Sequence, residues 1–206
     1  MSIKTKSILL IFIILLIDQT VKIYIKLNFA LGEYISISSW FKILFVENPG
    51  MAFGMEFGGK TGKLFLTIFR IIAVGALGYF IHTLIKKGAR QGYILTISLL
   101  LVGAAGNIFD SVFYGVLFSD SAGMAATFLP ETGGYAPLFY GKVVDMLYFP
   151  LFTFPQWMPF VGGDVFFSPV FNIADSSICI AVAIILIFFR RDLNESLENK
   201  SEKFKI

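Results

Sequence analysis

Two stretches decide the fold of this chain: YILTISLLLVGAAGNIFDSVF at residues 93–113 and FNIADSSICIAVAIILIFF at residues 171–189. Each has about the 20 apolar residues that a bilayer crossing requires, and each contains an Asn-x-x-Asp tetrapeptide, at 107–110 and at 172–175. Residues three apart share one face of an α-helix, so each tetrapeptide places an amide beside a carboxyl. A charge inside a membrane helix costs about 2.5 to 3.5 kcal/mol on insertion scales. The two stretches therefore predict a functional site shared by two helices.

The composition is that of an integral membrane protein. Of its 206 residues, 56% are hydrophobic and 15% are charged, and the mean hydropathy is +0.78, whereas soluble domains carry about 25% charged residues. No low-complexity linker divides the chain, so residues 1–206 are expected to form one domain. The net charge is +3, and the basic residues stand mainly in short clusters beside apolar runs. Such clusters indicate the orientation of membrane helices rather than a nucleic-acid-binding surface, so no nucleic-acid partner is expected.

The hydropathy pattern predicts four transmembrane helices, at about 7–27, 64–85, 93–113 and 171–189. Basic residues cluster at one end of them: Lys4 and Lys6 precede the first, Lys86, Lys87 and Arg90 join the second to the third, and Arg190 and Arg191 follow the fourth. Because basic clusters favour the cytoplasmic side, both termini and a tail at 190–206 are expected there. The first helix has no small-x-small cleavage site after it and is interpreted as a retained anchor.

The two outer connections are expected to shape a site. The segment at about 30–58 is rich in β-favouring side chains and ends in the turn sequence NPGMAFG at 48–54, so we expect a small β-rich platform. The outer loop at about 114–168 is aromatic and nearly uncharged, which favours a position on the membrane surface. The predicted fold is thus an all-α membrane core of four transmembrane helices with an outer β-rich platform and an aromatic surface segment.

The depth of three aspartates supports convergence on one site. At 1.5 Å per residue, Asp18 lies roughly 18 Å beyond Lys6, and Asp110 roughly 30 Å beyond Arg90. By the same rise Asp175 lies roughly 22 Å from Arg190. All three are therefore expected in the outer half of the bilayer, near one level.

Five motifs occur in order along the chain: DQTVK at 18–22, NPGMAFG at 48–54, GAAGNIFD at 103–110, VVD at 143–145 and FNIAD at 171–175. In order and spacing they resemble the bacterial lipoprotein signal peptidases, also called signal peptidase II. The resemblance implies an intramembrane aspartyl endopeptidase of the bacterial cytoplasmic (inner) membrane, with its active site toward the outer face. It implies removal of prolipoprotein signal peptides by cleavage before a diacylglyceryl-modified cysteine.

The resemblance also implies residue roles and partners. Asp145 and Asp175 would be the catalytic dyad, with no metal and no cofactor. The residues that would order the site or bind substrate are Asn48, Gly50, Asn107, Asp110, Asn172 and Ala174, and Asp18 and Lys22 would support them structurally. The expected partners are diacylglyceryl-modified prolipoproteins, membrane lipid and cyclic peptide inhibitors such as globomycin, and the chain is expected to be a monomer.

Paired carboxyls suit this chemistry, because two carboxyls about 3 Å apart cannot both ionise, so one can act as base toward water while the other donates a proton. Other interpretations remain open from the residues alone. Asp–Asn pairs can be interhelical hydrogen bonds, and Asp18 and Lys22 can form a structural ion pair four residues apart. A small transporter or proton pathway also places Asp and Asn in membrane helices, and a membrane scaffold would explain the aromatic outer loops.

Some positions depart from the family pattern or lack a role. Ser111 stands where family members commonly have arginine, and we hypothesise that Arg70 or Lys142 supplies the missing cation. Arg70 lies within the second predicted helix, where it could reach the outer headgroups or pair with a carboxylate of another helix. The stretches at 116–140 and 148–168 are long for the family and are expected to form a lid or a surface platform. The single cysteine, Cys179, is expected to be a small packing residue.

Overall fold

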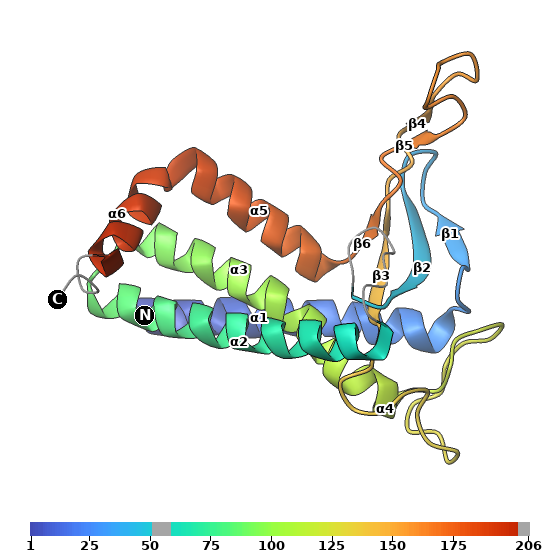
Figure 1. The fold of residues 1–206 in the computed structure, drawn as a ribbon, viewed down its shortest axis with the longest axis horizontal. Helices are drawn as coiled ribbons and strands as arrows, with labels where there is room; N and C mark the ends of the chain where they lie inside the picture. The colour runs from blue at the N-terminus through green and yellow to red at the C-terminus, as the bar shows by residue number, and fades with distance from the viewer. Residues whose placement is uncertain (51–58, 202–206) are drawn as a thin grey trace.

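The structure, a computed structural model, describes residues 1–50 and 59–201, with side chains to residue 198. Part of the expected NPGMAFG turn and the end of the β-rich segment lie outside the described residues. Four helices run alongside one another: α1 (Ile3–Asn28), α2 (Gly59–Lys86), α3 (Gln91–Phe109) and α5 (Ile173–Phe188). Figure 1 shows that both termini lie at one end of this bundle and the β-sheet at the other.

Three of the described helices are long and apolar enough to cross a membrane, namely α1, α2 and α3 with its continuation to Leu117. The fourth, α5, has 16 residues, or about 24 Å of helix at 1.5 Å per residue. It counts as a span only together with α6 (Arg190–Ser201), which bends away from it by 88°. The predicted fourth helix began at 171, but Phe171 belongs to a strand, and the predicted tail is largely helical.

Glycines let α3 approach its neighbours closely. A Cβ atom at Gly103 would overlap the carbonyl oxygen of Ala174, and one at Gly106 would lie 2.8 Å from Oδ2 of Asp18. Small residues at a membrane helix interface allow such close backbone contact. The two glycines therefore bring α1 and the start of α5 against the part of α3 that carries Asn107.

The end of α3 changes its helical geometry. Residues Asp110–Tyr114 form a π-helical turn, η2, and Gly115–Leu117 form a short helix, α4. Within this turn, Ser111 donates its hydroxyl to the carbonyl oxygen of Asn107, at 2.9 Å. A π turn inserts an extra residue into the helix and is frequent at functional sites. It rotates the helix face at the point where Asp110 is placed.

A four-stranded antiparallel sheet closes the end of the bundle opposite the two termini, in the order β1-β2-β3-β6. Its strands are β1 (Tyr34–Ser36), β2 (Lys42–Asn48), β3 (Val143–Tyr148) and β6 (Val170–Phe171). The sequence indicated strands only within the 30–58 segment, whereas the structure places β3 inside the segment at about 114–168 that was expected to be an aromatic outer loop. A single buried strand such as β3 reads as a short apolar run, which periodicity alone does not distinguish from other structure.

The sheet is attached to the helices by an apolar core. Phe45, Tyr114, Phe118, Val144 and Met146 are fully buried in this cluster, together with residues from the end of α1. Val144 and Met146 flank Asp145 on β3, and side chains alternate between the two faces of a strand. The core therefore fixes β3 with the Asp145 side chain on the opposite face.

One excursion extends from the sheet end of the bundle. Strands β4 (Phe152–Thr153) and β5 (Val165–Phe166) pair as a hairpin that projects sideways from the bundle, as Figure 1 shows. Phe152 and Phe166 stack at 4.7 Å between ring centroids, whereas Trp157 and Phe160 at the end of the excursion are exposed.

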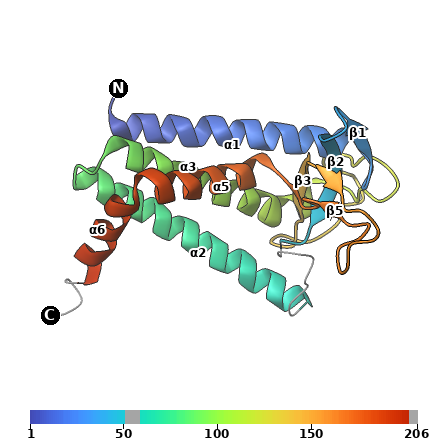
Figure 2. The ribbon, with the colours of Figure 1, turned by 90° about the horizontal axis from the view of Figure 1, so that it is seen from above.

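Seen from above in Figure 2, α2 diverges from α1 toward the sheet end.

Candidate active site

Asn172 connects the two aspartates of the predicted dyad. Its side-chain amide donates to Oδ1 of Asp145 at 2.7 Å, and its backbone N–H donates to Oδ2 of Asp175 at 3.4 Å. Asn172 is the N-cap of α5, where its side-chain oxygen accepts from the backbone N–H of Asp175 in a capping box. The capping box thus fixes Asp175 at the start of α5, and the side-chain amide of Asn172 extends to Asp145 on β3.

Asp145 is held on β3 with a side chain that is 2% exposed. Besides Asn172, the amide of Asn48 donates to its Oδ2 at 3.3 Å, from the adjacent strand β2. Burial raises the pKa of Asp145 to about 7, and repulsion from the Asp175 carboxylate acts in the same direction, against the hydrogen bonds from the two amides. Near neutral pH the pair of aspartates therefore holds a proton, which belongs to the pair as a unit.

Asp175 is oriented by a chain of contacts that begins on α1. The amide nitrogen of Asn107 donates to Oδ1 of Asp175 at 2.6 Å. The amide oxygen of Asn107 accepts from Lys22 at 2.9 Å and from Asn172 at 3.0 Å. Since both donors face the oxygen, the nitrogen is directed at the carboxylate. Lys22 acts on Asp175 through Asn107.

Lys22 is the centre of a buried ion cluster. Its ammonium group is 2.8 Å from Oδ2 of Asp110 and 3.0 Å from Oδ2 of Asp18, and all three side chains are at most 2% exposed. Gln19 donates to Oδ1 of Asp110 at 2.9 Å and accepts from the hydroxyl of Tyr114 at 3.1 Å. The predicted Asp18–Lys22 ion pair is confirmed, and the convergence of Asp18 and Asp110 at one level is confirmed with it.

The cluster also fixes the two elements that carry the dyad. Oδ2 of Asp110 accepts from the backbone N–H of Val144, next to Asp145, at 3.2 Å. Oδ1 of Asp18 accepts from the backbone N–H of Ala174, next to Asp175, at 2.9 Å. Each aspartate of the cluster therefore holds the chain beside one aspartate of the predicted dyad.

A pocket of about 200 Å³ opens over the two aspartates and is lined by Asn48, Gly50, Arg70, Asn107, Val143, Asp145 and Asp175. Gly50 is placed in it by a turn in which its N–H donates to Oδ1 of Asn48, at 2.8 Å, and it has a φ of +95° that favours glycine. The pocket gathers five of the predicted site residues. Asp110, Asn172 and Ala174 surround it without lining it.

The structure places three side chains whose roles were open: Arg70, Lys142 and Cys179. Arg70 lines the pocket and donates to the carbonyl oxygen of Gly50 at 2.7 Å. It also interacts electrostatically with the carboxylate of Asp175 on α5, which agrees with the expected interaction with a carboxylate of another helix, although no salt bridge joins the two among the described residues. Lys142 pairs with Glu47 at 2.9 Å outside the pocket. Cys179 is exposed on α5, so the expectation of a packing residue was wrong.

Sequence reasoning missed a second ion cluster at the sheet. Lys26 on α1 is fully buried, pairs with Glu47 and donates to Ser121 at 2.9 Å. The ring of Tyr135 lies 4.8 Å from its ammonium group. Burial alone would raise the pKa of Glu47, but the ammonium groups of Lys26 and Lys142 hold it below its usual value. Ser121 and Tyr135 belong to the 116–140 stretch, whose role the sequence left open.

Apolar helices that are long enough to cross a membrane, joined at one end to a polar pocket with two aspartates, define a membrane protein with an aspartic, acid–base type of site. Residues 10–191 match the model of the family Signal peptidase (SPase) II. The chain therefore belongs to the signal peptidase II family of aspartic peptidases.

Individual relatives agree with this assignment. The chain is 46% identical over 196 residues to a lipoprotein signal peptidase of Porphyromonas gingivalis, which covers 93% of this chain and 85% of the relative. It is 37% identical over 189 residues to one of Amoebophilus asiaticus, covering 88% and 76%. A solved structure of a bacterial membrane enzyme, obtained by the in meso method at 2.3 Å resolution, superposes with a TM-score of 0.58 at 26% identity, covering 93% of this chain and 91% of the other.

Proposed function

We propose that Asp145 and Asp175 are the catalytic dyad with which this lipoprotein signal peptidase removes the signal peptide of a prolipoprotein, before a diacylglyceryl-modified cysteine. The observation that carries the proposal is the bridge through Asn172, which contacts both carboxyls over one pocket. No observation favours the transporter or scaffold alternatives, which do not require two carboxyls to share one pocket.

The reaction follows from one proton shared by the dyad. The ionised carboxylate takes a proton from water as the water oxygen attacks the scissile carbonyl carbon, and the protonated carboxyl gives its proton to the carbonyl oxygen. The carboxyl that gained the water proton then protonates the leaving nitrogen, and the C–N bond breaks. One water is consumed, the signal peptide leaves with a carboxyl end, and the cysteine keeps a free amino group. The carbonyl re-forms and returns one proton to the dyad.

The surrounding residues position these groups. Asn48, Asn107 and Asn172 hold the carboxyl oxygens, while Asp18, Lys22 and Asp110 act as positioning residues behind them. Gly50 and Ala174 allow close backbone approach at the pocket and at α3. We expect a monomer to suffice, and we expect globomycin-type cyclic peptides to compete with substrate for the pocket.

We propose that the sheet end faces the outer side of the bacterial cytoplasmic membrane, with both termini in the cytoplasm. The basic residues Lys4, Lys86, Lys87, Arg90, Arg190 and Arg191 all lie on segments at the end opposite the sheet, which supports this orientation. The sideways hairpin, with Trp157 and Phe160 exposed, would then lie along the membrane surface, where aromatic side chains are favoured.

Arg70 is the better candidate for the cation that Ser111 does not provide. It lines the pocket, whereas Lys142 is paired with Glu47 outside it. An arginine can donate to peptide carbonyl oxygens while it keeps its bond to Gly50. Arg70→Gln should slow cleavage of a lipidated peptide, and Lys142→Gln should slow it less. Unchanged kinetics in the double variant would refute a role for either cation.

The dyad is tested with Asp145→Asn and Asp175→Asn in purified protein. Each should retain binding of a diacylglyceryl-modified substrate peptide but lose about 10²- to 10⁴-fold in the rate of signal peptide release, the usual worth of general acid–base catalysis. Asp164→Asn is the matched control, because Asp164 is an exposed outer aspartate away from the pocket. Normal cleavage by either dyad variant would overturn the assignment.

A further inference from the structure

A second groove with polar features lies far from the dyad, between the start of α1 and the end of α2. It has a volume of about 290 Å³ and lies at the end of the bundle opposite the sheet. Apolar side chains from three helices form most of its wall: Ile8, Ile11, Ile81, Ile85 and Leu101. Gly78 lines it too, and the absence of a side chain there leaves space toward Leu101.

The polar side chains of this groove lie at its rim and in its wall. Lys4 and Lys86 are both exposed cations that line it, and among the described residues neither has a salt bridge or a side-chain hydrogen bond. Among the described residues that line the groove none is acidic, and the remaining titratable side chain is that of His82. The hydroxyl of Ser7 also faces this region, is 97% buried as a residue (3% exposed), and has no hydrogen-bond partner among the described residues.

An unpartnered buried hydroxyl calls for a physical explanation, because burying a polar group without a hydrogen-bond partner is destabilising. Topology signals explain why lysines gather at this end, but they do not explain why two lysines and an unsatisfied hydroxyl line the same apolar groove. A ligand that has both an anionic acceptor group and an apolar chain would satisfy all of them.

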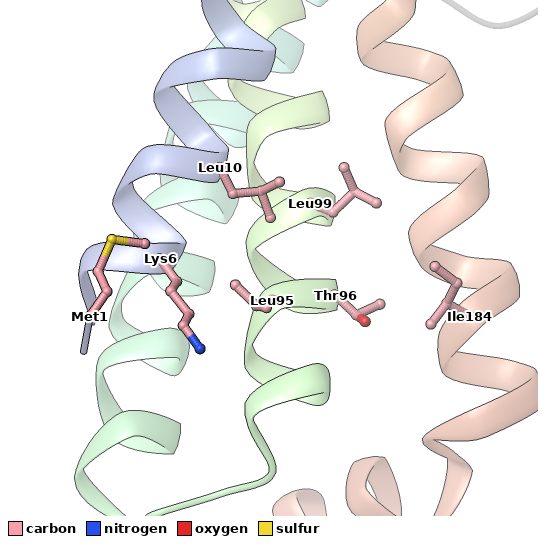
Figure 3. A pocket seen from close by; sticks show the side chains of 7 residues that line it. All are labelled: Met1, Lys6, Leu10, Leu95, Thr96, Leu99 and Ile184. Carbon is pink, nitrogen blue, oxygen red and sulfur yellow. The ribbon is translucent and has the colours of Figure 1, made fainter. Parts of the chain in front are cut away.

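A neighbouring groove provides a contrast within the same molecule. It is larger, about 410 Å³, and lies on the other side of α1, where Figure 3 shows Lys6 and Leu10 beside Leu95, Leu99 and Ile184. Its polar side chains are already paired: Lys6 donates to Gln91 at 3.2 Å, and Thr96 donates to the carbonyl oxygen of Gly92 at 2.8 Å. Among the side chains that line this groove, none is therefore a comparable unmet polar group.

We propose that the groove between α1 and α2 binds one anionic phospholipid of the surrounding bilayer. The lipid phosphate would accept from Lys4 and Lys86, an oxygen of its glycerol or ester region would accept from Ser7, and one acyl chain would lie along Ile8, Ile11 and Leu101. Basic pockets between transmembrane helices are suited to anionic headgroups. The lipid would join α2 to α1 at the end where the two helices have not yet diverged (Figure 2).

The test measures lipid binding to delipidated, detergent-purified protein by native mass spectrometry. Phosphatidylglycerol and phosphatidylethanolamine with the same acyl chains are titrated separately, and the preference is the ratio of their apparent affinities. The variant Lys4→Gln/Lys86→Gln is compared with Lys6→Gln/Lys87→Gln, which removes the same charge from the same end of the helix bundle but from residues that do not line this groove. Gly78→Leu fills the apolar part without changing charge.

The wild-type chain and the Lys6/Lys87 control should prefer phosphatidylglycerol. The Lys4/Lys86 variant should lose roughly tenfold or more of that preference, since each lysine near a membrane surface contributes about fivefold. Gly78→Leu should weaken phosphatidylglycerol binding. Equal losses in both double variants, no preference in the wild type, or unchanged binding in Gly78→Leu would each overturn the proposal.

A competition experiment separates a lipid site from a site for the free headgroup. Millimolar glycerol 3-phosphate should not displace phosphatidylglycerol, because the acyl chain supplies part of the binding. Displacement at that concentration would show a phosphate site only and would overturn the lipid assignment. Since these measurements do not involve proteolysis, they succeed or fail independently of the proposed dyad.

Discussion

Replacing Lys22 by methionine is expected to damage both the stability and the catalytic rate of the protein. The substitution keeps an unbranched chain of similar length but removes the ammonium group that lies 2.8 Å from Asp110 and 3.0 Å from Asp18. Both carboxylates would stay buried without their cation. Removing one partner of a buried ion pair costs about 3 to 5 kcal/mol. For a chain of this size each kcal/mol shifts the melting temperature by about 2 to 4 °C, so we expect a decrease of roughly 6 to 20 °C.

The rate should fall for a separate reason. Without Lys22 the oxygen of Asn107 loses one of the two donors that direct its nitrogen to Asp175. A displacement of a catalytic group by about 1 Å can cost about 10²-fold, and because Lys22 does not line the pocket the loss should be in kcat rather than KM. Thermal unfolding in detergent and steady-state cleavage of a lipidated peptide measure the two effects.

Two further variants make this prediction decisive. Lys22→Met/Asp110→Asn removes one of the stranded charges and should recover part of the lost melting temperature. Arg90→Met breaks an ion pair with Asp192 in which the arginine side chain is 67% exposed; such pairs contribute about 1 kcal/mol or less, so the melting temperature should shift by at most about 4 °C. The reasoning is refuted if Lys22→Met melts and cleaves like the wild type, or if Arg90→Met loses as much stability.

Three other outcomes are expected. The raised pKa of Asp145 is about 7, so the dyad loses its remaining proton as the pH rises past this value. The value of kcat/KM should therefore fall tenfold per pH unit above about pH 7. A profile that stays flat to pH 9 would contradict this. Gly103→Ala should cost about 1 to 3 kcal/mol, since the new methyl group meets the Ala174 carbonyl, whereas Gly75→Ala, with open space around it, should not lower the melting temperature. Glu47→Gln leaves the ammonium group of Lys26 buried without a carboxylate and should destabilise the protein by about 3 to 5 kcal/mol in thermal unfolding, while Glu131→Gln, at an exposed position, should change little.

The sequence by itself determined the helices and the polar level at which they meet. An apolar run of about twenty residues matches the thickness of a bilayer, and an Asp inside such a run needs a partner at the same depth. These constraints are local, so Asn107, Asp110, Asn172 and Asp175 could be assigned to one site, and Asp18 could be paired with Lys22, before any contact was known.

Only the tertiary structure decided what each of these groups contacts. Strand β3 reads as a short apolar run in an aromatic loop, and its place in the sheet depends on pairing with β2, about 100 residues earlier in the chain. Its amide at Val144 meets Asp110, and its carboxyl at Asp145 meets the cap of α5. The place of Arg70 also depends on the tertiary structure, because its side chain reaches the pocket by donating to the carbonyl oxygen of Gly50. Hydrogen bonds between distant segments have directions and lengths that no local pattern encodes, because they are set by the packing of α1, α3, α5 and the sheet around one another.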